Sequence, residues 1–120
     1  MIAHMVDDNL RRLSQIAFAF DQEQKILTKF EELEDYQNVV ILMDEKSAKE
    51  HYKNPISLDD FKPKKKSTFV IGKNYPDIPF HEQIPDNDSY DILYIPFTKP
   101  TPLHAECALS IVLYQVKKFL

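Results

Sequence analysis

Three continuous runs of apolar residues constrain the fold of this chain more than any other feature. They occupy residues 39–43, 69–71 and 92–95 and are rich in β-branched side chains. Continuous runs, unlike alternating ones, are typical of strands in a parallel sheet that helices cover on both faces. With two weaker segments, 2–6 and 25–29, they predict a mostly parallel five-stranded sheet.

Helical patterns lie between these runs. Asp7 or Asp8 can cap a helix over residues 9–20, and Asp44 can cap one over 45–53. Thr101 as N-cap and Pro102 at the first position predict the start of the last helix, 103–120. Single helical turns are expected at 31–36 and between 76 and 85. The alternation predicts one domain, residues 1–120, with a three-layer α/β/α fold.

Composition narrows the possible functions. Apolar residues form 43% of the 120-residue chain, and no apolar run approaches the length needed to cross a bilayer. Residues 1–6 are too short for a signal peptide. The single cysteine, Cys107, excludes an internal disulfide, so we expect a cytoplasmic protein.

Glycine and charge exclude further classes. The chain has one glycine and no G-x-G-x-x-G or Walker-type loop, which argues against Rossmann dinucleotide sites and P-loop NTPases. Its net charge of −4 argues against a free-standing nucleic-acid binder. Binding of RNA would therefore need a local basic patch, a second subunit or a protein partner. His4, His51, His81 and His104 do not have metal-ligand spacing, so no metal site is expected.

The last predicted helix has two apolar faces. The wide face includes Leu109, Leu113 and Val116, and a narrower one carries Cys107, Ile111 and Tyr114. A surface helix needs only one apolar face. The second face therefore predicts either a contact with a second subunit or cover by a loop of the same chain.

Two strand ends are unusual. The only glycine, Gly72, follows residues 69–71, and three prolines in residues 96–102 follow the run 92–95. Ligands of open parallel sheets bind beyond the carboxyl ends of the strands. The proline-rich loop also leads into a helix N-terminus, which suits a carboxylate, although the prolines could simply stiffen a connection.

Residues 94–97 and 103–108 read Tyr-Ile-Pro-Phe and Leu-His-Ala-Glu-Cys-Ala. They resemble the last motif of the SPOUT RNA methyltransferases. Residues 69–72, Phe-Val-Ile-Gly, resemble the preceding one. The first motif, an Asn opening a helix with an Arg and ending in Ala and Phe, resembles residues 8–20. The pair His104 and Glu106 is similar to the His-x-Glu pair of an archaeal branch that methylates tRNA ribose.

This resemblance implies an S-adenosylmethionine site in a C-terminal trefoil knot and a homodimer through the last helix. It implies that Arg11 or Arg12 meets the RNA ribose and phosphate, and that His104 lines the pocket or accepts a proton. Lys64, Lys65 and Lys66 are candidates for contacts with RNA phosphates. The implied cofactor-binding residues are Ile71, Gly72, Lys73, Ile95, Pro96, Leu103 and Glu106.

Each residue also has a simpler interpretation. The arginines could be a solvated first-turn pair, and His104 and Glu106 could be ordinary polar residues of a helix N-terminus. The lysines could belong to a solvated loop, and Cys107 could be a small packed side chain.

The chain also departs from the SPOUT motifs. Asn74 stands where the family has Glu, Pro102-Leu103-His104 replace Ser-Leu-Asn, and the glycine after Ile-Pro is missing. These departures and the net acidity favour a first alternative, a non-catalytic SPOUT-like domain that binds RNA or protein. A second alternative is a flavodoxin-like or receiver-like module, supported by Asp44 at a strand end.

Overall fold

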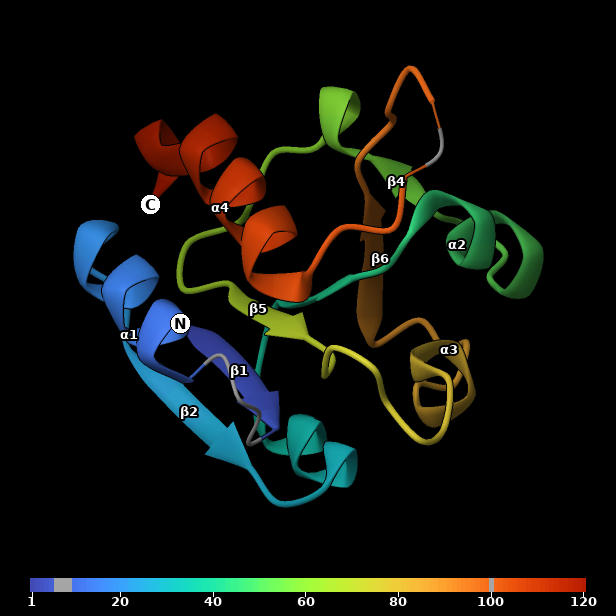
Figure 1. Ribbon diagram of the computed structural model, residues 1–120, viewed down its shortest axis with the longest axis horizontal. Coiled ribbons are helices and arrows are strands. Elements are labelled where there is room, and N and C mark those ends of the chain that lie inside the picture. The colour runs from blue at the N-terminus through green and yellow to red at the C-terminus, as the bar shows by residue number, and fades with distance from the viewer. Residues whose placement is uncertain (6–9, 100) are drawn as a thin grey trace.

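A six-stranded parallel sheet forms the centre of the computed structural model, which describes residues 1–5, 10–99 and 101–120 (Figure 1). The strands run in the order β2-β1-β5-β3-β6-β4, and all five pairings are parallel. Their bounds are β1 Ile2–Met5, β2 Gln24–Leu27, β3 Val39–Leu42, β4 Ile56–Ser57, β5 Thr68–Ile71 and β6 Tyr90–Tyr94.

All five predicted strands are present, but the predicted number is wrong by one. The additional strand, β4, has only two residues and pairs with Leu93 and Tyr94 at the end of β6. Two residues are too few to produce a recognisable apolar pattern, so only the pairing itself reveals this strand.

The strand order argues against the flavodoxin-like alternative. Flavodoxin-like and receiver folds place their strands in the order 2-1-3-4-5. Here β5 lies between β1 and β3, so the strand next to β1 comes later in the chain than β3. The order does not fit that alternative.

Helices cover both faces of the sheet, which confirms the three-layer prediction (Figure 1). Helices α1 (Leu10–Ala19) and α4 (Ala105–Val116) pack on one face, where Phe69 and Ile71 are buried. The opposite face packs against a 3-10 helix, Phe30–Asp35, and against α2 (Glu45–His51) and α3 (Phe80–Gln83). Short 3-10 helices also occupy Leu58–Asp60 and Lys117–Phe119.

The helix starts show where local sequence signals succeed. Asp44 caps α2, as predicted, because its side chain accepts a hydrogen bond of 3.0 Å from the Ser47 N–H. The predicted start of α4 is wrong: the helix begins at Ala105, and the Thr101 hydroxyl donates to the Lys99 carbonyl instead. The predicted cap of α1, Asp7 or Asp8, lies outside the described residues.

The start of α4 is satisfied from another part of the chain. The Ala105 N–H donates to Asn74 Oδ1 at 2.8 Å, so the loop after β5 supplies the cap. A local motif search cannot find a cap that is 31 residues away in sequence. Among the described helices, none has the length and apolar character needed to span a bilayer.

Candidate functional site

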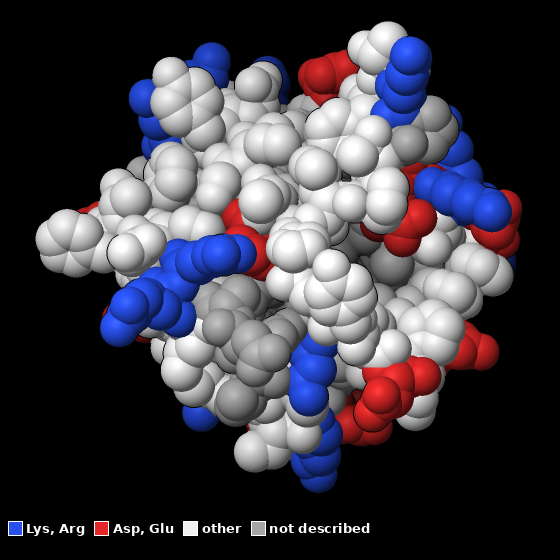
Figure 2. Space-filling model, in the orientation of Figure 1, with Lys and Arg blue, Asp and Glu red and all other residues white. Residues whose placement is uncertain are grey.

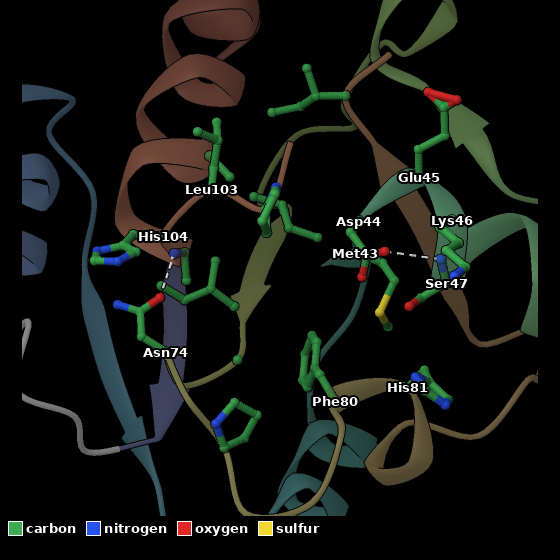
Figure 3. A pocket seen from close by; sticks show the side chains of 18 of the residues that line it. Met43, Asp44, Glu45, Lys46, Ser47, Asn74, Phe80, His81, Leu103 and His104 are labelled. Carbon is green, nitrogen blue, oxygen red and sulfur yellow. Dashed lines mark hydrogen bonds between the residues drawn. The ribbon is translucent and has the colours of Figure 1, made fainter. Parts of the chain in front are cut away.

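Three loops at the carboxyl ends of β3, β5 and β6 enclose a cavity of about 810 Å³. Ligand pockets in proteins typically measure roughly 300–1,000 Å³. The face seen in Figure 2 is hollowed between these loops. In the close view, Asn74 and His104 stand on one side, Asp44 to Ser47 on the other, and Phe80 near the lower edge (Figure 3). The cavity therefore lies where ligands of parallel sheets bind.

Most of the predicted cofactor-binding residues line this cavity, namely Ile71, Gly72, Lys73, Ile95 and Leu103. Pro96 and Glu106 are not among its described lining residues. The prediction placed the cofactor between two loops, after β5 and after β6, and both are present. It missed the third wall, which includes Met43, Asp44 and Ser47. The sequence could have predicted this wall, because the apolar run 39–43 is also a central strand and its carboxyl end lies at the same edge of the sheet.

Gly72 is required by a neighbouring side chain. A Cβ atom built on Gly72 would lie 2.8–3.1 Å from ring atoms of Phe80. Carbon atoms that close cannot both keep their positions. A larger residue at position 72 would therefore displace the Phe80 ring, which itself lines the cavity.

Glu106 is a buried carboxylate beside the cavity. Its side chain is 4% exposed and its oxygens accept hydrogen bonds from Arg12 Nη1 at 3.1 Å and Asn74 Nδ2 at 2.8 Å. Buried carboxylates are normally retained only when paired in this way. Glu106 is therefore more than a plain first-turn residue stabilised by the helix dipole, because its buried carboxylate is paired with Arg12 and Asn74.

Arg12 and Arg11 differ in their surroundings. Arg12 reaches Glu106 across the α1–α4 interface, while its side chain stays 68% exposed. Arg11 is exposed, and its guanidinium makes no hydrogen bond or ion pair with another described residue. The structure thus brings one arginine of the pair, Arg12, to the site.

His104 stands between the buried carboxylate and a tyrosine. Its Nδ1 lies 3.5 Å from Glu106 Oε1, and its Nε2 lies 3.2 Å from the Tyr75 hydroxyl. The Tyr75 and His104 rings meet edge to face, with centroids 5.7 Å apart. Both residues line the cavity, and the imidazole is directed away from its middle, toward the α1 side (Figure 3). A carboxylate next to an imidazole forms an arrangement in which the imidazole can accept a proton.

Tyr52 fixes α3, the helix whose Phe80 and His81 line the cavity. Its hydroxyl donates to the backbone carbonyls of His81 at 3.2 Å and Ile84 at 2.7 Å, at the end of α3. Burial, with a smaller effect of the Asp86 carboxylate, raises the pKa of Tyr52 to about 12. The phenol therefore stays protonated and holds α3, with Phe80, against α2.

The remaining predicted site residues lie elsewhere. Lys64, Lys65 and Lys66 are exposed and precede β5, at the opposite end of that strand from Gly72. Cys107 is exposed too, and Ile111 and Tyr114 are 39% and 66% exposed. No loop of the described chain buries this second face of α4, so that explanation for it is wrong.

Neither the scan against protein-family models nor the search of curated proteins finds a match for this chain. Function must therefore be argued from the site itself. Within the described part of the chain, no group of three or more His, Cys, Asp or Glu side chains is placed to bind a metal ion.

Proposed function

We propose that this protein is an S-adenosylmethionine-dependent RNA methyltransferase of the SPOUT class, acting on a tRNA ribose 2′-hydroxyl. One observation carries the proposal: a cavity of about 810 Å³ and a buried carboxylate, Glu106, adjoin at the loops where the SPOUT-like motifs lie. The loops after β5 and β6 lie at one edge of the sheet, and Arg12 of the first motif reaches Glu106 of the last, which supports a common role.

The cavity lining suits the proposed cofactor. S-adenosylmethionine combines a flat aromatic adenine ring with a positively charged sulfonium and a methionyl group that carries an ammonium and a carboxylate. Ile95, Phe97 and Leu103 offer apolar surface, and the acidic side chains of Asp44 and Glu45 belong to the facing wall. These residues would hold the cofactor, which supplies an electrophilic methyl group when bound.

The chain's own residues would act on the acceptor. The exposed part of Arg12 can meet a phosphate, for which a guanidinium is well suited because of its planar fork of donors. Glu106 holds the guanidinium of Arg12 in place through its hydrogen bond with Nη1. His104, with its Nδ1 facing Glu106, presents Nε2 as the acceptor for the proton of a hydroxyl group.

One departure from the SPOUT motifs has a structural counterpart. Asn74 stands where the family has Glu, and its amide donates to Glu106. A carboxylate therefore still lies next to the Gly72 loop, but it belongs to α4 and not to the loop itself. This arrangement favours the catalytic proposal over the non-catalytic one.

Two further parts of the proposal follow from the resemblance. We propose that the segment from β6 to α4 forms a trefoil knot. Its support is that this segment returns to the loop after β5, where Ala105 bonds to Asn74. We also propose a homodimer through Cys107, Ile111 and Tyr114, because this apolar face is exposed on the single chain.

Calorimetry with S-adenosylmethionine tests the cofactor site. We expect binding by the wild type and binding at least about tenfold weaker in Gly72→Val, because displacement of the Phe80 ring would change the wall of the cavity. Ile78→Val is the control, since Ile78 is exposed and does not line the cavity. No heat at millimolar cofactor would refute the proposed activity.

Methyl transfer from labelled cofactor to total tRNA tests the reaction. A ribose 2′-O-methyl group protects the adjacent phosphodiester from alkaline hydrolysis, so we expect the label in alkali-resistant dinucleotides. Cofactor binding without transfer to any RNA would favour the non-catalytic binding domain, which the net charge of −4 supports.

Sedimentation tests the dimer. Ile111→Glu should convert the dimer to a monomer at micromolar concentration, because it places a charge in the proposed apolar contact. Gln115→Glu adds the same charge at an exposed polar position of α4 and should leave the dimer intact. A wild-type monomer would contradict the proposal.

A further inference from the structure

Tyr75 is an unusual residue at the cavity. Its side chain is 85% exposed, yet its hydroxyl lies 3.2 Å from His104 Nε2. Its backbone φ is 52°, in the left-handed region that residues other than glycine adopt rarely. A strained backbone persists only where its surroundings enforce it, and it often marks a functional position.

The surroundings of Tyr75 explain what holds it. Asn74, the preceding residue, donates to Glu106 and accepts from the Ala105 N–H, which fixes the loop against α4. His104, the residue before Ala105, then meets the Tyr75 ring edge on, at a centroid distance of 5.7 Å. The loop that carries Asn74, the partner of Glu106, therefore also places the Tyr75 hydroxyl next to His104.

The direction of the proton in this contact can be assigned from the charges. A carboxylate 3.5 Å from Nδ1 favours the tautomer with hydrogen on Nδ1. Nε2 is then the acceptor, and the Tyr75 hydroxyl donates to it. A general base needs this same tautomer when it receives a proton from a substrate hydroxyl.

We infer that the Tyr75 hydroxyl occupies the position on His104 Nε2 that the acceptor hydroxyl of the substrate takes, so that substrate must displace it. This inference rests on the proposed function. Tyr75 is a gate for the acceptor site and takes no part in the reaction. Its high exposure leaves the ring room to swing outward.

Chemical modification of His104 tests the contact without RNA. Diethylpyrocarbonate acylates an unprotonated, accessible imidazole nitrogen, and mass spectrometry reports the rate at each histidine. Tyr75→Phe keeps the ring and removes the hydroxyl. His104 should then react about 2- to 10-fold faster, the range to which one intramolecular hydrogen bond corresponds. His51 and His81 are internal references, and Tyr36→Phe is the control for loss of a phenol elsewhere.

A second measurement tests displacement by substrate. In Tyr75→Phe, the KM for total tRNA should fall by about 2- to 10-fold, because no internal hydroxyl competes for Nε2. Equal modification rates at His104 in wild type and variant would overturn the inference, and so would a tenfold lower kcat in the variant. If the wild type transfers no methyl group, the proposed function fails, and the modification rates still decide whether Tyr75 covers His104.

Discussion

The two ends of β5 were both predicted to contact ligands, and they differ in how they are built. At the amino end, Lys64, Lys65 and Lys66 are exposed, and the hydrogen bonds near them involve backbone carbonyls, such as Ser67 to Lys64 and Asn38 to Lys65. At the carboxyl end, the loop after Gly72 is bonded to α4 and borders the cavity.

This difference distinguishes a charged surface from an assembled site. The lysines are adjacent in sequence and need no tertiary contact to be near one another. Arg12, Asn74 and Glu106 are separated by up to 94 residues and come together only in the folded chain. Polar groups held in a buried, paired arrangement can be positioned precisely, as catalysis requires. Changes at the carboxyl end should therefore have much larger effects than changes at the amino end.

The largest effect is expected for Glu106→Gln. Gln keeps the size of the side chain but removes the charge that pairs with Arg12 and orients His104. Methyl transfer to tRNA should fall by at least about 100-fold, the lower part of the range for general base catalysis. Urea unfolding should show a stability loss of about 1–3 kcal/mol. Full activity in this variant would contradict the conclusion that the carboxyl end of β5 matters more for function than the amino end.

Arg12→Lys should have the next largest effect. Lysine keeps the charge but lacks the planar fork that can bond to Glu106 and a phosphate together. The kcat/KM for tRNA should fall about tenfold, or roughly 1.4 kcal/mol of transition-state stabilisation. Arg11→Lys is the matched control and should differ from wild type by less than about twofold. The reverse ranking would mean that Arg11 contacts the RNA.

Tyr52→Phe tests whether the Tyr52 hydroxyl stabilises the position of α3, whose Phe80 lines the cavity at the carboxyl end. Removing the phenol leaves the His81 and Ile84 carbonyls without this donor, so the free energy of unfolding should fall by about 1–2 kcal/mol at pH 7.

The same residue predicts a pH dependence. Because its pKa rises from 10.0 to about 12 on folding, its contribution to stability is complete below pH 10. It is lost as the pH rises from 10 toward 12, where the unfolded chain ionises first. Urea titrations at several pH values should show this extra loss in the wild type relative to Tyr52→Phe. Parallel curves for the two proteins above pH 10 would contradict the role of Tyr52.

The smallest effect is expected at the amino end of β5. Replacing Lys64, Lys65 and Lys66 together by Gln should weaken tRNA binding by only about threefold, and the salt dependence should decrease by about one unit of slope. The control replaces Lys53, Lys117 and Lys118, which are also exposed. A larger loss than that caused by Arg12→Lys would reverse the comparison and identify the lysines as the main RNA contact.

The sequence by itself determined the layers of the fold and the edge of the sheet where the site lies. Apolar runs and helical periodicity depend on local composition, so the five longer strands and the positions of the helices could be predicted from them. The carboxyl-end rule then located the Gly72 loop and the loop after β6. The side-chain cap of α2 by Asp44 was predictable too, because donor and acceptor are three residues apart.

Only the tertiary structure decided which residues meet at that edge. The cap of α4 comes from Asn74, the two-residue strand β4 exists only through its pairing, and Phe80 makes Gly72 necessary. It also separated Arg12 from Arg11 and placed Tyr75 on His104. Each of these contacts joins segments that are distant along the chain, and their burial and direction depend on how the layers pack. A local pattern carries no information about such contacts, because it describes neighbours in sequence and not neighbours in space.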